Sequence, residues 1–173
     1  PGIPTGFNPL RLPDTPVNRA FLRDWLGTLL APAHGPMLPA DETVIAAAVD
    51  ANFEQSFALR TLSHFGELLG GTKRPEEGDL QSRLRPWLDH ADRGWVFDNV
   101  LDRLDLSNRI IGFDMTAVLD QPAIRTAVMM YLFHRVDERL DGSPAMIMID
   151  EGWKVLDDPV FAARLRDWLK TLR

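Results

Sequence analysis

Residues 145–149 form a run of five apolar residues, Ala-Met-Ile-Met-Ile, and two adjacent carboxylates follow it directly at Asp150 and Glu151. A strand buried on both faces of a parallel sheet reads as a continuous hydrophobic run of this kind. In open α/β sheets, ligand chemistry gathers at the carboxyl ends of such strands. The pattern is therefore typical of a Walker B strand, the acidic strand of nucleoside triphosphate hydrolases.

The acidic pair suggests two chemical roles. In this class of reaction the first carboxylate holds Mg²⁺, commonly through water, and the next polarises the attacking water. We expect Asp150 to be the Mg²⁺ ligand and Glu151 to be the general base, and both to lie at the bound ATP. The alternative is that this motif arises by chance and its two acids are solvated or cap the following turn.

The second half of a triphosphate site is missing from the chain. No stretch of the 173 residues matches the phosphate-binding pattern G-x-x-x-x-G-K-[ST]. Without the lysine and the backbone cradle of that loop, the strand alone cannot hold a triphosphate. Because the chain opens at Pro1 without a methionine and stops at Arg173 within a predicted helix, we expect it to be a piece of a longer protein and to lack ATPase activity alone.

Composition excludes several other classes. The formal net charge of −6 argues against broad electrostatic binding to nucleic acid or anionic lipid. The absence of cysteine excludes disulfides and thiolate metal sites. No apolar stretch approaches the roughly 18 residues of a membrane span. The four histidines lack metal-ligand spacing, so a zinc site is not expected.

Apolar spacing of three and four residues predicts helices, and short β-favouring runs predict strands. Asp14-Thr15-Pro16 combines a capping hydroxyl with a proline in the first turn, which predicts a helix start there. Pro86 is expected to kink or end its helix. Helices are predicted at about 16–30, 41–53, 63–69, 80–88, 122–140 and from 159 onward, and strands at 95–97, 110–113 and 145–149.

From residue 94 onward the expected order is strand, helix, strand, helix, which is typical of a parallel sheet with right-handed crossovers. The block before it reads as helices only. We therefore expect an α/β fold, a parallel sheet with flanking helices, formed by residues 1–30 and 94–173. Residues 31–93 are expected to form an all-α subdomain.

Other polar residues are weaker candidates. Asp114 ends the predicted strand 110–113, where a turn-forming role is the more common one. Trp153 could contact a ligand, although a tryptophan there more often packs on the next helix. The last helix carries a basic edge, which could sense phosphate or contact a neighbouring subunit, or could simply be solvated. This edge consists of Arg166, Lys170 and Arg173.

Several local sequences resemble one family. Asp-Glu-Gly-Trp at 150–153, followed by a helix that ends in Lys-Thr-Leu-Arg at 170–173, is fairly specific among P-loop proteins. Together with the stretches 8–10, 18–26, 96–98, 112–116 and 131–135, it resembles the CagE, TrbE, VirB family of type IV secretion and conjugation ATPases. The resemblance covers nearly the whole chain and is weakest between about 31 and 90.

The resemblance implies a RecA-like P-loop NTPase motor domain interrupted by an all-helical subdomain. Its Walker B positions fall on Asp150 and Glu151, with ATP and Mg²⁺ as cofactors, and its Walker A loop would precede Pro1. Such ATPases are similar in acting as homo-oligomers, together with other type IV secretion subunits, at the cytoplasmic face of the bacterial inner membrane. The resemblance does not indicate whether these ATPases contact nucleic acid.

Two other interpretations compete with this one. A related DNA-translocating, RecA-like coupling ATPase would carry a similar motor core. A non-catalytic protein-interaction module would dock a partner on its helical block, and its acidic pair would then be incidental.

Overall fold

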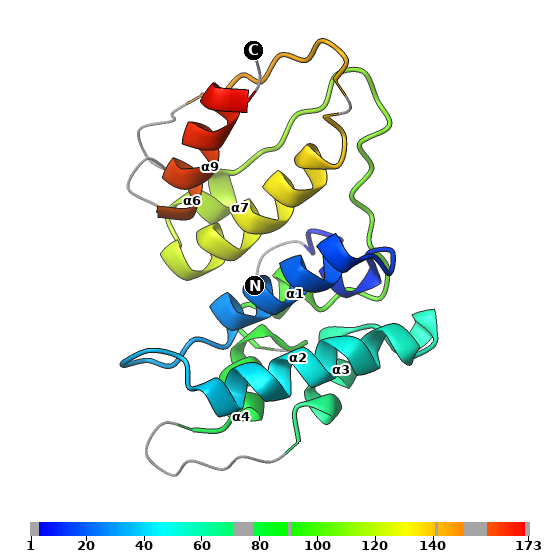
Figure 1. The fold of residues 1–173 in the computed structure, drawn as a ribbon, viewed down its shortest axis with the longest axis vertical. Helices are drawn as coiled ribbons and strands as arrows, with labels where there is room; N and C mark the ends of the chain where they lie inside the picture. The colour runs from blue at the N-terminus through cyan, green and yellow to red at the C-terminus, as the bar shows by residue number, and fades with distance from the viewer. Residues whose placement is uncertain (1–3, 71–77, 90, 141, 151–158, 172–173) are drawn as a thin grey trace. The chain divides into compact units, whose positions relative to one another are not determined.

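The computed structural model describes residues 4–70, 78–89, 91–140, 142–150 and 159–171. The chain divides into two compact units, Pro1–Leu104 and Asp105–Arg173. In the described ranges the regular structure of both units is helical (Figure 1). The expected insert, 31–93, falls wholly inside the first unit, and its boundaries stay a prediction.

The expected α/β fold is wrong: no strand, and hence no parallel sheet of a RecA-like domain, occurs among the described residues. Residues 95–97 belong to helix α5 (Gly94–Phe97). Residues 110–113 and 145–149 are neither helix nor strand. Among the described residues, no backbone hydrogen bond joins 145–149 to another segment. A strand is defined by the hydrogen bonds of a neighbouring strand, so an apolar run without such a neighbour is not one.

The α1 to α4 helices of the first unit pack against one another in chain order. Helix α1 packs on α2, α2 on α3, and α3 on α4. The elements are η1 (Pro9–Arg11), α1 (Pro16–Leu29), α2 (Pro39–Glu54), η2 (Phe57–Leu59), α3 (Leu62–Leu68), α4 (Leu80–Leu84), η3 (Arg85–Trp87) and α5 (Figure 1).

The ends of these helices follow from local sequence. The Thr15 hydroxyl accepts a hydrogen bond from the N–H of Asn18, and Pro16 occupies the first turn of α1, as expected. Asp79 caps α4 in the same way. Helix α4 ends at Leu84, and the chain continues as the 3₁₀ turn η3, because Pro86 lacks the N–H that an α-helix needs there.

An aromatic cluster forms the centre of the first unit. The rings of Trp25 and Phe97 meet edge to face with centroids 4.9 Å apart, and the Trp87 ring lies 5.9 Å from Phe97. Edge-to-face contacts of this kind are favourable beyond the apolar area that they bury. The buried face of α1 includes Leu22 and Leu26, whereas Val17 is 67% exposed. The buried face of α1 therefore leaves out Val17 in its first turn.

Asn8 ties the N-terminal segment to the rest of the first unit. Its side chain is buried and donates to the carbonyls of Arg60, at 2.8 Å, and Asn99, at 2.6 Å. Its amide oxygen accepts from the N–H of Leu10. A buried amide with its donors and acceptor used is favourable, while the same group unpaired would be costly.

The second unit is formed by α6 (Thr116–Leu119), α7 (Pro122–Asp137) and α9 (Pro159–Thr171), and α7 contacts both of the others. Its core contains Phe133 and Trp168, whose rings meet edge to face at 5.0 Å, and Met129. The helix predicted to begin at Pro122 and the one predicted to begin at Pro159 are confirmed. Among the described residues, no helix is both long and apolar enough to span a bilayer.

Candidate functional site

Of the expected catalytic pair, Asp150 lies among the described residues, at an exposed part of the second unit. Asp150 is an exposed turn residue that follows the apolar run. In that run exposure alternates along the chain, with Met146 at 84%, Ile147 at 40%, Met148 at 85% and Ile149 at 42%. The buried, mid-sheet setting expected for this run is therefore absent, because no second strand covers it among the described residues.

Glu151, the expected general base, and Trp153 lie outside the described residues. The described part of the chain contains no group of three or more acidic, histidine or cysteine side chains that could hold a metal ion. Asp150 is thus the member of the expected Mg²⁺ and ATP site that the structure places, and the role of both residues stays a prediction.

Asp114 forms a local turn. Its carboxylate accepts from the hydroxyl of Thr116, at 2.6 Å, and from the N–H of Thr116, at 3.0 Å, directly before α6. These two hydrogen bonds, that of the hydroxyl first, lower the pKa of Asp114 below its usual value of 3.8. The turn-forming role is the one that the structure supports.

The basic edge of the last helix is partly described. Arg166 and Lys170 are exposed on α9, and Arg173 lies outside the described residues. The Nε of Arg166 donates to the carbonyl of Ala162, one turn earlier in the same helix. Arg166 and Lys170 therefore lie on a solvent-exposed face of the helix. A role of this basic edge in binding phosphate or a neighbouring subunit stays a prediction.

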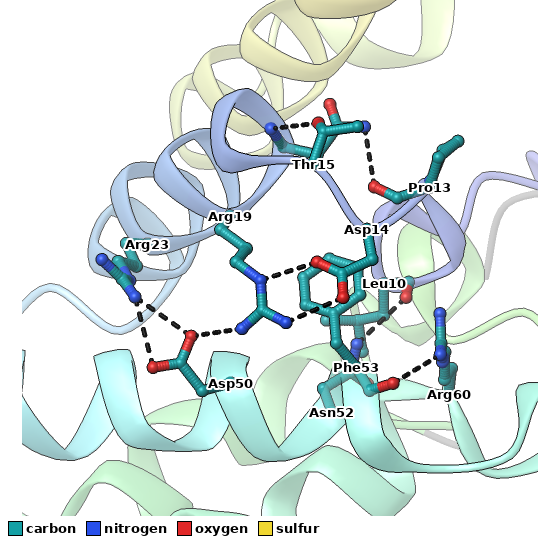
Figure 2. A network of polar contacts seen from close by, with 11 residues as sticks. Leu10, Pro13, Asp14, Thr15, Arg19, Arg23, Asp50, Asn52, Phe53 and Arg60 are labelled. Atoms are coloured by element: carbon teal, nitrogen blue, oxygen red, sulfur yellow. Dashed lines mark hydrogen bonds and ion pairs between the residues drawn. The ribbon is translucent and has the colours of Figure 1, made fainter.

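The most developed set of charged contacts lies in the first unit, where the sequence interpretation had placed no site. Figure 2 shows Asp50 of α2 between the guanidinium groups of Arg19 and Arg23 of α1. The Arg19 guanidinium donates one hydrogen bond to Asp50, at 2.6 Å, and two to Asp14, at 2.6 and 2.8 Å. Arg19 and Arg23 are four residues apart and share a helix face, which is a signal that the sequence did contain.

The electrostatic effects in this network follow from hydrogen bonding. The pKa of Asp14 and the pKa of Asp50 are both lowered below the usual 3.8, mainly by the hydrogen bond that each carboxylate accepts from Arg19. Asp50 also accepts a hydrogen bond from Arg23, which lowers its pKa further. The bonds of Arg19 to these two carboxylates, that to Asp14 first, raise the pKa of Arg19. The carboxylate side chains are about half exposed, at 50% and 47%. The ion pairs of Asp50 with Arg19 and Arg23 therefore join α1 to α2 at a solvent-exposed surface, and such pairs contribute modestly to stability.

A second ion pair, between Arg83 and Asp41, is buried. Their side chains are 9% and 1% exposed, and an N–H of Arg83 donates to Asp41 at 2.6 Å. Arg83 also donates to the carbonyl of Leu30, the residue after α1, at 2.9 Å. It contacts the sulfur of Met37 as well, at 3.6 Å. One guanidinium thus connects the end of α1, the start of α2 and α4.

Arginines also surround two phenylalanines of the first unit. Arg19 and Arg60 lie over the ring of Phe53, 4.7 and 5.4 Å from its centroid. Arg60 and Arg11 lie over the ring of Phe57, at 4.4 and 5.5 Å. Cation–π contacts of this kind favour guanidinium groups over aromatic faces.

Comparison with known proteins places the chain in a class. No family model matches it. Over 99% of its length, however, it aligns with proteins of bacterial type IV secretion systems. The class of protein to which the chain is similar is therefore that of type IV secretion system proteins.

The particular relatives are VirB4 and PtlC proteins. The chain is 41% identical to the type IV secretion system protein VirB4 of Bartonella henselae, 39% identical to PtlC of Bordetella pertussis and 32% identical to VirB4 of Agrobacterium fabrum. Each alignment covers 99% of this chain and 22% of the relative. The chain is thus homologous to a segment of VirB4 and PtlC proteins, which confirms the resemblance seen in the sequence.

Proposed function

We propose that the chain is a segment of an ATP-hydrolysing motor that energises type IV secretion or conjugative transfer. In this proposal Asp150 holds Mg²⁺ through water and Glu151 activates the attacking water. The observation that supports it is the alignment of 99% of the chain with VirB4 and PtlC proteins. The aligned segment contains the only Asp-Glu pair that follows a five-residue apolar run in the sequence.

The described residues fit one half of such a site. Mg²⁺ in nucleotide sites is held by one or two carboxylates, with water and phosphate oxygens as its other ligands. A single exposed carboxylate such as Asp150 suits a water-mediated contact of this kind. The described residues do not fit the triphosphate itself, because the sequence has no glycine-rich loop with a lysine. The proposal therefore assigns the phosphate contacts to regions outside this segment.

The proposal extends to the setting of the parent protein. The chain spans about a fifth of the length of the curated relatives that it matches, 22%. We propose that the longer protein works as a homo-oligomer with other secretion subunits at the cytoplasmic face of the inner membrane. In that setting this segment supplies the acidic groups of the catalytic site.

The test uses the full-length protein that carries this segment. Glu151→Gln should lower the rate of ATP hydrolysis by about 100-fold or more, because a general base contributes at least that factor. ATP affinity should be largely retained, because only the water-activating group is lost. Asp150→Asn should raise the Mg²⁺ concentration needed for half-maximal activity. Asp120→Asn, which alters an exposed carboxyl of the same unit, serves as the matched control and should leave both quantities unchanged.

Two results would contradict the proposal. Retained hydrolysis in Glu151→Gln would remove Glu151 from the role of base. Robust ATP hydrolysis by the 173-residue chain alone would show that the phosphate site lies within it after all.

A further inference from the structure

A second surface of the chain points to a binding role that is separate from the acidic pair. It consists of Arg11 at the end of η1, Phe57 and Leu59 of η2, and Arg60, which follows η2 directly. We call these four residues the arginine–phenylalanine patch. Phe57 is 54% exposed and Leu59 is 40% exposed, so the patch presents apolar surface next to the partly exposed Arg11, whereas Arg60 is 7% exposed.

The patch is rigidly built. An N–H of Arg11 donates to the carbonyl of Phe57. Arg60 donates to the carbonyl of Phe53 at 2.8 Å and to that of Gln55 at 3.2 Å, so it holds the end of α2. Both guanidinium groups also lie over the Phe57 ring. The geometry of the four residues is therefore set by the fold and needs little ordering when a partner binds.

Among the described residues, no carboxylate forms a direct ion pair with the arginines of the patch, Arg11 and Arg60. By contrast, Arg19, Arg23 and Arg83 all form ion pairs. Asp14 lies near enough to act on Arg60, but its carboxylate is held by Arg19. Burial lowers the pKa of Arg60, and the charge of Arg11 adds to that effect. A buried cation without a carboxylate is costly, and an incoming anion relieves that cost.

We propose that the arginine–phenylalanine patch docks an acidic, apolar peptide segment of a partner protein. A carboxylate of the partner would pair with the partly exposed Arg11, the positive charge of the buried Arg60 would add to the attraction, and an apolar side chain beside the carboxylate would cover Phe57 and Leu59. Arginine next to an exposed aromatic ring is the composition enriched at the energetic centres of protein interfaces.

The charge of the molecule favours a peptide over a nucleic acid. Nucleic-acid binding depends on many phosphate contacts, each neutralised by a basic group. The patch has two guanidinium groups, of which that of Arg60 is buried, on a chain whose net charge is −6. Two cations suit one carboxylate, and the apolar half of the patch would have no counterpart along a phosphate backbone.

The experiment measures binding of labelled probes to the full chain by fluorescence anisotropy. The first probe is a short peptide in which glutamate alternates with leucine; the others are the same peptide with lysine for glutamate and a single-stranded oligonucleotide. We expect the glutamate peptide alone to bind saturably, with an affinity that falls as salt is added. Arg11→Gln and Phe57→Ala should each weaken that binding by about ten-fold, as expected for loss of one charge-assisted hydrogen bond or one buried anchor.

Matched controls keep the outcome interpretable. Arg109→Gln and Phe113→Ala make the same chemical changes at exposed positions of the second unit and should leave binding unchanged. Should Arg11→Gln lower the melting temperature, Leu59→Asp and Leu59→Lys serve instead, because Leu59 is exposed. Both changes remove the apolar contact of Leu59, but the aspartate also repels the glutamates, so Leu59→Asp should weaken binding of the glutamate peptide more than Leu59→Lys does.

Failure of the glutamate peptide to bind, or equal binding by wild type and all patch variants, would overturn the proposal. Binding of the oligonucleotide that is lost in the same variants would overturn it in favour of a nucleic-acid surface. None of these results depends on ATP hydrolysis, so the patch and the acidic pair stand or fall separately.

Discussion

The indole N–H of Trp168 donates a hydrogen bond of 2.7 Å to the carboxylate of Asp137, which joins α9 to α7 in the second unit. The same ring packs edge to face on Phe133. One side chain therefore supplies both an apolar and a polar contact between these two helices, which are remote in sequence.

Trp168→Phe should keep the aromatic contact and lose the hydrogen bond, so we expect the free energy of unfolding to fall by about 1–3 kcal/mol. Urea unfolding followed by circular dichroism measures this. Asp137→Asn should cost less, because the amide oxygen still accepts from the indole. Trp95→Phe is the control, since its N–H donates to the carbonyl of Asp92 in an exposed setting; an equal loss there would refute a special role for Trp168.

Arg83→Met should destabilise the first unit by about 3–5 kcal/mol, because Asp41, with its side chain 1% exposed, would lose its buried ion pair with Arg83. The double change Arg83→Met with Asp41→Leu should recover much of the loss, since neither charge is then buried. Arg23→Met removes an exposed partner of Asp50 and should cost about 1 kcal/mol or less. Denaturant midpoints compare all three, and a double variant no better than the single one would contradict the expectation.

The Arg19 network predicts a pH dependence of stability. The folded state lowers the pKa of Asp14 and Asp50, so their contribution is present above the usual carboxyl pKa of 3.8. It is lost as the pH falls below 3.8 and through the lowered values, because the folded state must then give up its ion pairs on protonation. Stability of the first unit should therefore decline as the pH is lowered from about 5.

Arg19→Gln should flatten this decline, and Arg109→Gln, an exposed arginine of the second unit, should not. Urea midpoints measured across the acid range provide the comparison. An unchanged pH profile in Arg19→Gln would mean that the network does not couple to folding.

Gly94 begins α5 at a point of close backbone contact. A Cβ at this position would lie 2.1 Å from the carbonyl oxygen of Leu88, a contact that requires the backbone to move. We expect Gly94→Ala to cost at least about 2 kcal/mol. Gly112→Ala meets no atom within 4 Å and should change stability by no more than about 0.5 kcal/mol. Melting temperatures distinguish the two, and equal values would contradict the predicted clash.

Local sequence predicted the helices well. Thr15 and Pro16 begin α1 as expected, and Pro86 ends α4. The helices that begin at Pro122 and Pro159 are also confirmed. Capping hydroxyls, proline and apolar spacing act within a few residues, so these signals are present in the sequence itself.

The prediction of strands was wrong because strand formation depends on segments that are distant in the chain. Residues 145–149 have the composition of a buried strand, but a strand requires hydrogen bonds from a second segment. A local run contains no information on whether that segment is present. The apolar residues Trp95, Val96 and Phe97 likewise form a turn of helix α5 in the first unit rather than a strand.

By itself, then, the sequence determined where helices begin and end, that a complete phosphate-binding loop is missing from these residues, and that the chain resembles a type IV secretion family. Only the tertiary structure decided that Asp41 pairs with Arg83, that Arg19 links Asp14 to Asp50, and that Arg11 and Arg60 meet at Phe57. The physical reason is range. Caps and helical periodicity act between near neighbours in the chain, whereas ion pairs, ring contacts and strand pairing join residues that only folding brings together.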